Sequence, residues 1–280
     1  DISGKVISNL KIYVNDSKTK EKIKEPEDVE LLQENFDQLY LWGKENNIKF
    51  NGSKFQVLRF GTNERIKEET VYFTDEMKEI IEQVNSTKDL GVIVTDDAKF
   101  DEHIDSMCKK VKQRSGWVLR TFYTRSLYFM KTIFKSLIQP HIDYCSQLWM
   151  PQQGQKLEKI ERLLKSWTGR IPALRSLNYW QRLKDMNMYS QQRRLERYRV
   201  IYTWKVLQGL VPNPGVMEAR ENESLGRRCQ LPRLNKKTRM SVQTMKDNSF
   251  QTNGPKLFNS LPKVLRNMKK CTEEDFKEEL

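Results

Sequence analysis

Lysine and arginine residues gather in three segments of the back two-thirds of the sequence, and aromatic residues interleave with them. The cations in these segments are Lys109, Lys110, Lys112, Arg114, Arg120, Arg125, then Lys156, Lys159, Arg162, Lys165, Arg170, and finally Arg193, Arg194, Arg197 and Arg199. Each lysine or arginine that lies near a phosphate releases a condensed counterion, which favours binding to nucleic acid. The three segments therefore predict a surface for a polyanion, with RNA or DNA as the leading partner.

The net charge is distributed unevenly along the chain. Residues 1–110 carry 17 Lys+Arg and 23 Asp+Glu, a net charge of −6, whereas residues 111–280 carry 33 and 14, a net charge of +19. Such asymmetry indicates that one part of the molecule attracts a polyanion. The alternative is that these helix faces are a solvated exterior that binds nothing specific.

The cysteines do not indicate a metal site or a disulfide framework. Cys108, Cys145, Cys229 and Cys271 are far apart and form no CxxC pair, which favours free thiols in a reducing, intracellular compartment. His141 and Cys145 are four residues apart and would share a helix face, but no second close pair completes a tetrahedral site. The sequence leaves open whether the compartment is the nucleus or the cytoplasm.

The first 95 residues predict short strands and one helix. Residues 7–16 predict a strand that ends in a tight turn at Asn15-Asp16, and a return strand is expected after this turn. Pro26 suits the first turn of an amphipathic helix that extends to about Asn46. The other expected strands are Ile48–Phe50 and Phe55–Phe60 around a turn at Asn51-Gly52, and Asp89–Thr95 as one strand.

The rest of the chain reads as mainly helical. Helices are expected from Asp101 onward, with a turn near residues 124–126, then from Phe129 to Leu137, over residues 155–172 and from Tyr189 to Leu210. After Pro212 the periodicity is weak until an amphipathic closing piece from Phe258 to Phe276. The tryptophans Trp149, Trp167, Trp180 and Trp204 are expected mostly in the core. No run of about 18 apolar residues predicts a membrane span.

The order of these segments resembles the C-terminal half of LINE-type (non-long-terminal-repeat) retrotransposon reverse transcriptases of the Jockey and related groups. The first four matching motifs are Ile12–Asp16 (IYVND), Leu31 to Trp42 followed by Asn51–Lys54 (NGSK), Lys88–Val92 (KDLGV) with Phe100 and His103, and residues 122–149 with Leu137, Pro140, Tyr144 and Trp149. The fifth is a downstream C-terminal segment that comprises Ser176–Leu183 (SLNYWQRL) and Asn259–Pro262 (NSLP) with Phe276-Lys277. Each motif alone is weak, but five in the right order cover almost the whole chain. The resemblance implies RNA-directed DNA polymerase parts, a nucleotidyltransferase chemistry.

What the resemblance implies for the fold is an α+β, mostly α protein. Residues 1–95 would form a partial palm of short antiparallel strands and one helix, residues 96–154 a helical thumb, and residues 155–280 a basic helical C-terminal region. The partner would be the template–primer duplex of RNA and DNA, and no membrane. The beginning at Asp1 suggests an incomplete start, so that N-terminal polymerase and endonuclease parts are expected to be missing.

The resemblance also implies a catalytic site, from which this sequence departs. The family holds Mg²⁺ with two aspartates on the palm hairpin and one on an earlier strand, which would precede Asp1. Here Asn15 stands in place of the first hairpin aspartate, and a neutral amide holds a cation less strongly than a carboxylate. Asp16 is then the remaining metal ligand, and Lys54 stands where the family has a basic residue that can protonate the leaving pyrophosphate. An exposed turn lysine is an equal alternative for Lys54.

Two functional readings follow from these departures. The first is a reverse-transcriptase fragment that cannot polymerise alone and binds no Mg²⁺ tightly, although the intact family enzyme uses Mg²⁺. The alternative is a non-catalytic nucleic-acid-binding protein that derives from a decayed element.

Overall fold

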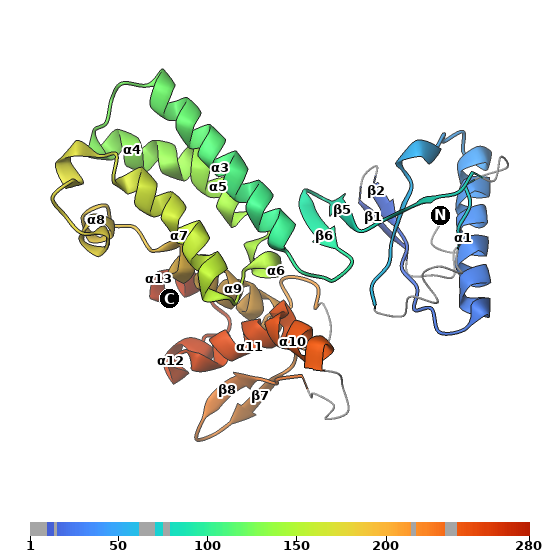
Figure 1. Ribbon diagram of the computed structural model, residues 1–280. Helices are drawn as coiled ribbons and strands as arrows, with labels where there is room; N and C mark the ends of the chain where they lie inside the picture. Colours follow the sequence, from blue (N-terminus) through green and yellow to red (C-terminus); the bar gives the residue numbers. More distant parts are fainter. Residues whose placement is uncertain (1–9, 14–15, 62–70, 75–78, 214–216, 233–239) are drawn as a thin grey trace. The chain divides into compact units, whose positions relative to one another are not determined.

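The computed structural model describes residues 10–13, 16–61, 71–74, 79–213, 217–232 and 240–280. These residues form an α+β fold that is mostly α-helical, as the sequence predicts. The chain divides into two compact units, residues 1–99 (unit 1) and residues 100–280 (unit 2), and each is described by itself (Figure 1). Within the described residues, no helix is both long enough and apolar enough to cross a membrane.

Unit 1 contains two-stranded sheets. β1 (Lys11–Tyr13) pairs antiparallel with β2 (Asp16–Lys18), which confirms the predicted strand and return strand, although the two residues between them lie outside the described residues. β3 (Gln56–Leu58) pairs in parallel with β4 (Glu82–Val84), whereas the sequence predicts antiparallel strands. A parallel return requires a connection of about a dozen residues or more, and the long stretch between β3 and β4 provides it.

The predicted strand from Asp89 to Thr95 is instead a hairpin. β5 (Ser86–Asp89) pairs antiparallel with β6 (Val92–Thr95). The two residues between them, Leu90 and Gly91, have φ angles of 45° and 89°. Positive φ at both positions is the requirement of a tight type I′ turn, so the glycine reverses the chain rather than lying within a strand. The predicted strand Ile48–Phe50 is also wrong, because these residues join no sheet.

Helix α1 (Pro26–Glu45) forms as predicted and carries one face of the unit 1 core. Its N-terminus is stabilised by Asp28, whose carboxylate accepts hydrogen bonds from the backbone N–H groups of Lys24 and Glu25 at 2.7 and 3.0 Å. On the inner face, Phe36 packs edge-to-face on Phe55 and Tyr72 at ring distances of 6.4 and 6.2 Å. Unit 1 is therefore organised around aromatic rings rather than around an extended sheet.

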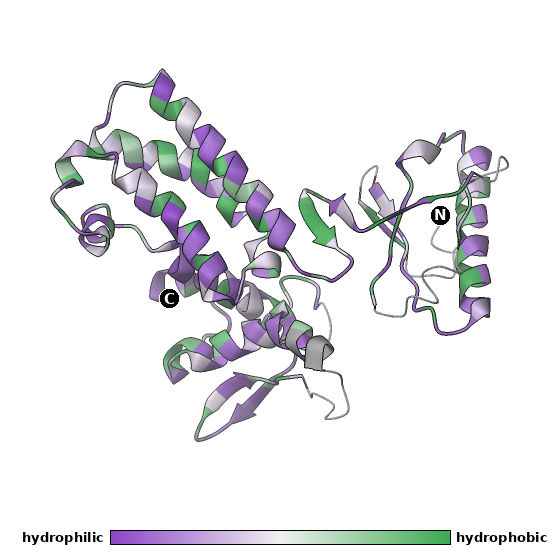
Figure 2. Cartoon of the chain, in the orientation of Figure 1, coloured by the Kyte–Doolittle hydropathy of each residue, from purple (hydrophilic) through white to green (hydrophobic). Residues whose placement is uncertain are grey.

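Unit 2 is a bundle of helices. Its first group consists of α3 (Asp101–Thr121), α4 (Leu127–Ile133), the π-helical turn η3 (Phe134–Ile138), α5 (Gln139–Asp143), α6 (Ser146–Trp149), α7 (Gly154–Thr168), the 3₁₀ turn η4 (Pro172–Leu174), α8 (Tyr179–Asp185) and α9 (Gln191–Leu207). Figure 2 shows apolar and polar residues alternating along α3 and α7, as expected for helices that each bury one face. The turn near residues 124–126 lies where the sequence predicts it, and α7 begins at Gly154, one residue before the predicted start of the helix over residues 155–172.

Hydrogen bonds from buried polar groups fix the packing of this first group. The Trp167 indole nitrogen donates to the Met130 carbonyl at 3.1 Å, which joins α7 to α4. Gln139 and Gln191 exchange amide hydrogen bonds at 3.1 Å in each direction, which joins α5 to α9. Because unpaired polar groups are costly to bury, such pairs specify one arrangement of the helices.

The second group of unit 2 follows Pro212, where the sequence predicts little structure before Phe258. The chain there forms the antiparallel hairpin of β7 (Ala219–Asn222) and β8 (Gly226–Cys229), followed by α10 (Met240–Asn248). The predicted closing piece from Phe258 to Phe276 is divided among three helices, α11 (Phe250–Ser260), α12 (Lys263–Arg266) and α13 (Glu273–Glu279). Pro262 is the N-cap residue of α12 and Thr272 that of α13, and each marks the break before its helix. This group packs on α9, where Trp204 stacks on Phe276 at 4.7 Å.

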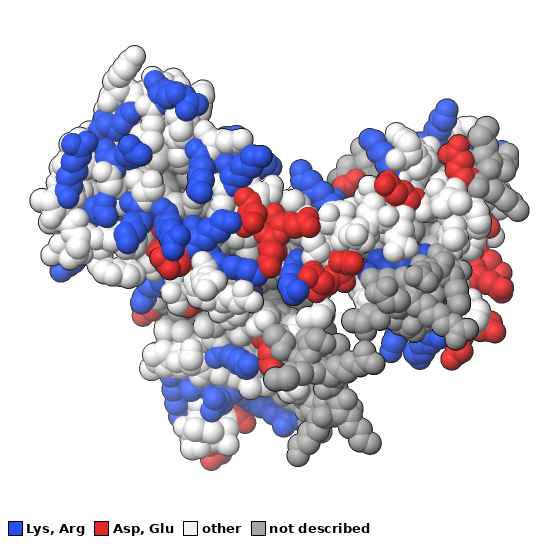
Figure 3. Space-filling view, in the orientation of Figure 1, with Lys and Arg blue, Asp and Glu red and all other residues white. Residues whose placement is uncertain are grey.

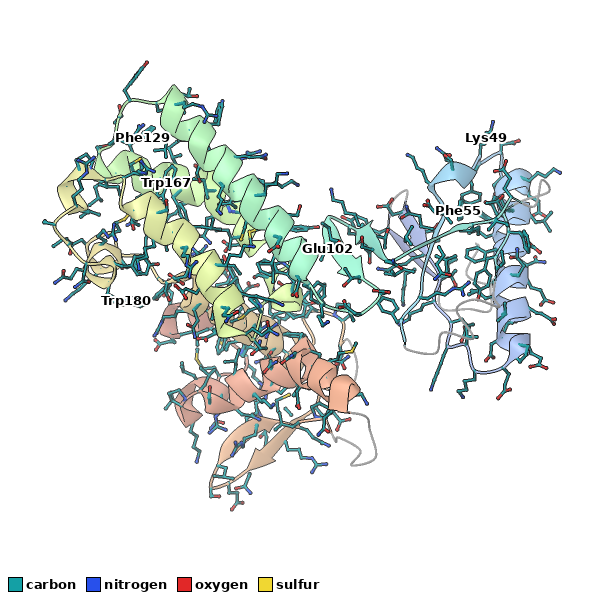
Figure 4. The ribbon with its side chains drawn as sticks, viewed as in Figure 1. Lys49, Phe55, Glu102, Phe129, Trp167 and Trp180 are labelled. Atoms are coloured by element: carbon teal, nitrogen blue, oxygen red, sulfur yellow. The ribbon has the colours of Figure 1, made fainter. Side chains whose placement is uncertain are left out.

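Three of the four tryptophans predicted for the core are buried, and one is not. Trp149, Trp167 and Trp204 are at most 2% exposed. Trp180 is 66% exposed, and its side chain points outward from α8 (Figure 4). Its neighbour Tyr179 takes the buried position on that short helix instead, with its hydroxyl donating to the Glu161 carboxylate.

Candidate nucleic-acid interface

Helix α3 is amphipathic: one side is buried and apolar, and the exposed side carries five cations. The buried residues recur at helical spacing: Ile104, Met107, Cys108, Val111 and Val118. The polar positions between them therefore point away from the core. The exposed cations on this outer face are Lys109, Lys110, Lys112, Arg114 and Arg120. Within the part of the chain that the structure describes, none of these five forms an ion pair.

Helix α7 lies beside α3 and runs in the same direction. Lys156 pairs with Asp101, and Lys159 pairs with Asp105. The residue numbers increase in the same direction on both helices, so the two helices are parallel. These two pairs neutralise the N-terminal ends of α3 and α7. Farther along, Arg162 pairs with Glu158 of its own helix at 3.0 Å, and Lys165 is exposed. The surface of the two helices therefore changes from balanced charge at one end to an excess of cations at the other.

Figure 3 shows the same change of charge on one face of unit 2. Acidic side chains gather near the start of α3, where Glu102 lies (Figure 4). Lysine and arginine side chains cover the helices beyond it. We call the five exposed cations of α3 together with Lys165 the basic face.

An open pocket of about 490 Å³ lies at one edge of the basic face and includes two of its cations. It is lined by Lys110, Gln113, Arg114, Trp117 and His141. Trp117 is 51% exposed, which is unusual for the largest apolar side chain, and Phe122 packs on it edge-to-face at 6.3 Å. Burial, together with the nearby cations Arg114 and Lys110, lowers the pKa of His141, which keeps its ring neutral at physiological pH.

Several of the predicted phosphate-binding arginines bind protein groups instead. The Arg125 guanidinium donates to backbone carbonyls at the C-terminal end of α3, among them Leu119 at 2.6 Å. Arg194 forms a bidentate pair with Asp143, with its Nη2 at 2.9 Å, and Arg197 donates to the Lys277 carbonyl. Arg193 is exposed and lies 5.4 Å from the Tyr189 ring centre. These four arginines contribute to the fold of unit 2, and only Arg193 among them is largely open to solvent.

Arg199, which the sequence groups with the α9 cations, is completely buried. Its guanidinium donates to the carbonyls of Gln147 and Met150 at 3.2 and 3.0 Å. Burial lowers its pKa to about 10, so the side chain keeps its charge in the interior. It caps the C-terminal carbonyls of α6 and is not accessible to a ligand. Arg170 is exposed at the end of α7.

The residues of the predicted catalytic site lie in unit 1. Asp16 is exposed at the start of β2, Asn15 lies outside the described residues, and Lys54 is exposed at the end of the 3₁₀ turn η2 (Gly52–Lys54). Another carboxylate near this hairpin, that of Asp89, forms an ion pair with Lys18. Among the residues that the structure describes, no three His, Cys, Asp or Glu side chains lie close enough to hold a metal ion. The described residues therefore do not fit a two-metal site, and we derive no reaction step from them.

His141 and Cys145, which the sequence predicts to share a helix face, do not lie on one helix. α5 ends at Asp143, and Cys145 has a φ of 51°, so the chain turns between the two residues. His141 belongs to the Trp117 pocket instead, which sequence reasoning missed. The signal was present, since Lys110, Gln113, Arg114 and Trp117 are spaced at three, four and seven residues and so share one helix face.

Comparison with models of known protein families, with curated proteins and with solved structures finds no match to this chain. The proposals below therefore depend on the sequence motifs and on the geometry of the two units.

Proposed function

We propose that unit 2 binds the sugar–phosphate backbone of a nucleic-acid duplex through its basic face. We propose further that the chain is the hairpin-to-C-terminal part of a LINE-type reverse transcriptase, in which α3 to α6 serve as the thumb and α7 begins the basic C-terminal region. The observation that carries the first proposal is the charge change along α3 and α7. Acidic partners neutralise the cations at one end, and the basic face at the other end has no acidic partner among the described residues.

This charge pattern suits a backbone better than a base sequence. Lysines on the outer face of a straight helix are long and mobile, and they bind phosphates as point charges without reading base edges. A polymerase must hold templates of every sequence, so backbone contacts are the ones it needs. In an RNA–DNA hybrid the deep, narrow groove keeps base edges out of reach of side chains, so a protein recognises the hybrid mainly by its shape and its phosphates.

A helical protein–protein module is the competing class of function. Interfaces of that kind exclude lysine from their centres and use exposed apolar or aromatic anchors. The outer side of α3 instead exposes Lys109, Lys110 and Lys112. The half-exposed ring of Trp117 lies among the polar and charged side chains of its pocket rather than in an apolar patch. This composition favours nucleic acid.

The test compares two triple variants in binding to a labelled RNA–DNA duplex across a salt series. One variant removes cations of the basic face (Lys109→Ala, Lys112→Ala, Lys165→Ala). The matched control removes three exposed lysines of unit 1 (Lys11→Ala, Lys20→Ala, Lys22→Ala). Each lysine that contacts a phosphate contributes about 0.9 to the slope of log affinity against log salt. The basic-face variant should lose about 2 to 3 in slope and the control little, whereas equal losses would refute the proposal.

The second part of the proposal is that these 280 residues do not polymerise by themselves. Asn15 replaces one hairpin aspartate of the family pattern, and the family's earlier palm aspartate matches no position in residues 1–280. The purified chain should extend no primer in Mg²⁺, and Asn15→Asp should not restore extension. Template-dependent extension by either protein would refute this part. A chain that neither binds the duplex nor extends a primer would count against both the reverse-transcriptase proposal and the alternative of a nucleic-acid-binding protein from a decayed element.

A further inference from the structure

We infer that the Trp117 pocket takes one unpaired nucleotide of a single strand, with the base against the Trp117 ring and the adjacent phosphate against Lys110 and Arg114. This inference rests on the proposed function, because the pocket adjoins the basic face that would hold the duplex. It adds a preference that backbone binding alone does not provide: the chain would bind a junction between duplex and single strand more tightly than a blunt duplex.

The first support is the state of Trp117 itself. Its side chain is half exposed although α3 has a buried face, and its edge-to-face packing on Phe122 holds the indole in place. A fixed aromatic face costs little entropy on binding and is attractive to any base, since every base has a π-face. A base inside a duplex already stacks on its neighbours, so only an unpaired base can use this face.

The second support is the chemistry around the ring. Lys110 and Arg114 are exposed and lie one helical turn from each other, which places two cations beside the aromatic face. Gln113 and neutral His141 offer hydrogen-bond donors and acceptors to a base edge. A volume of about 490 Å³ lies in the range of about 300–1,000 Å³ typical of ligand pockets.

A strand suits the surroundings better than a free nucleotide does. Phe122 also contacts Phe129 at 5.5 Å, so the rings from Trp117 to Phe129 form one aromatic cluster between α3 and α4. Next to this cluster, Tyr123 and Tyr128 are 94% and 80% exposed. The Arg125 bonds to the end of α3 and the Ser126 cap of α4 hold the connecting loop in place. Further bases of a strand could therefore stack beyond the pocket.

The experiment uses the whole chain and three labelled probes: a blunt RNA–DNA duplex, the same duplex with a single-stranded extension of about five nucleotides, and the single-stranded oligonucleotide of the extension alone. Unlabelled AMP and unlabelled oligonucleotide serve as competitors. The extension carries 2-aminopurine, whose fluorescence falls when it stacks. The wild-type chain should bind the extended duplex more tightly and quench its fluorescence. Trp117→Ala should weaken binding to the extended duplex about tenfold, equal to about 1.4 kcal/mol, and leave blunt-duplex binding unchanged.

Two further variants keep the result interpretable. Trp117→Phe should retain most of the preference, because it keeps an aromatic face. Trp180→Ala removes another exposed tryptophan of unit 2 and should change neither affinity. A Trp117→Ala protein with unchanged preference and quenching would overturn the inference, and so would equal losses in Trp117→Ala and Trp180→Ala.

The two proposals fail in different ways. A wild-type chain that binds the duplex with a steep salt dependence but gains nothing from the extension would overturn the pocket alone. A chain that binds the single-stranded oligonucleotide through Trp117 but ignores the duplex would overturn the proposed function alone. If AMP competes as effectively, mole for mole, as the oligonucleotide, the occupant of the pocket is a free nucleotide, and the inference that a single strand occupies it is overturned.

Discussion

Unit 1 and unit 2 differ in both charge and core. Residues 1–99 carry 15 Lys+Arg and 20 Asp+Glu, and residues 100–280 carry 35 and 17. The core of unit 1 depends on half-buried aromatic rings around α1, whereas the largest fully buried side chains of the described residues all lie in unit 2. Excess charge of one sign destabilises a compact state through self-repulsion. Unit 2 has both the larger net charge and the deeper apolar core, and burial of that core offsets the repulsion among its cations.

The comparison also separates two kinds of cation within unit 2. Some lie on the basic face and have no acidic partner among the described residues, while others bind carboxylates or carbonyls of the fold. Sequence alone groups them together. The following predictions test whether core, fold-binding cations and exposed groups can be altered independently, from the largest expected effect to the smallest.

The largest effect is expected for Trp204→Ala. Trp204 is completely buried, stacks on Phe276 and donates to the Met268 carbonyl at 3.0 Å. Loss of a buried tryptophan typically costs about 3–5 kcal/mol. Urea unfolding followed by circular dichroism should show this loss, and Trp180→Ala should change stability by less than about 0.5 kcal/mol. Similar values for the two variants would mean that unit 2 lacks the deep core described here.

An intermediate effect is expected for Arg194→Met. The change removes the bidentate partner of Asp143, whose carboxylate also accepts from Tyr198 at 3.0 Å. Because the pair is only partly buried, we expect a loss of about 1–3 kcal/mol of stability rather than the larger cost of a fully buried pair. Duplex affinity measured at a protein concentration where the variant is folded should not change.

Arg114→Met is the matched control for that variant. Arg114 is exposed on the basic face, so its replacement should leave urea unfolding unchanged and lower duplex affinity. If Arg194→Met weakened binding as much as Arg114→Met did, the division between fold-binding and ligand-binding cations would be wrong.

A smaller effect concerns acid stability of unit 1. Hydrogen bonds from Lys99 and Thr95 lower the pKa of Asp97 from 3.8 to about 2. Because the folded pKa is depressed, the stabilisation is fully present above the unfolded value and is lost as the pH falls through about 2. Asp97 is about half exposed, so solvent screening limits the effect to less than about 1 kcal/mol. Asp97→Asn should be less stable to urea than the wild-type chain above pH 3.8, and the difference in stability between the two should disappear near pH 2.

The smallest effect is a difference in thiol reactivity, which leaves stability unchanged. Burial raises the pKa of Cys108, and it raises that of Cys229 to about 11. Since the thiolate is the reactive form, both should react slowly with iodoacetamide. Cys145 and Cys271 are only partly buried and should be labelled first, as mass spectrometry of the native chain can determine. Labelling of all four at one rate would indicate that unit 2 opens readily.

Local patterns in the sequence predict the long helices of this chain well, and its strands and the shorter helices after Pro212 less well. The Pro26 helix has the predicted bounds to within a residue, because a proline and a regular apolar stripe are local signals. The hairpin at Leu90-Gly91 was read as one strand because its apolar run is continuous, and a leucine with positive φ is rare. Trp180 was assigned to the core by residue type, which does not reveal that Tyr179 takes the buried place.

The candidate site shows the same division. Helical periodicity predicts that the cations of α3 share an outer face, and the structure places them there. It cannot predict the roles of Arg194 or Arg199, whose partners Asp143 and Met150 are some 50 residues away along the chain. The Trp117 pocket also requires His141 from another helix, which only the packing of α5 on α3 brings close. Long-range partners are the part of the site that local patterns do not contain.

The π-helical turn from Phe134 to Ile138 has a consequence for how this chain can change in length. A π turn holds an additional residue within a continuous helix, so it is a point where a single residue has been accommodated without a break. At 3.6 residues per turn, one residue more or less rotates everything that follows by about 100°. Gln139 and Asp143, which bind Gln191 and Arg194 of α9, come directly after it. The π turn absorbs that rotation locally. Deleting Ser136 should therefore leave an ordinary α-helical turn in which both side chains still face their partners, whereas a second inserted residue would turn both of them away from α9.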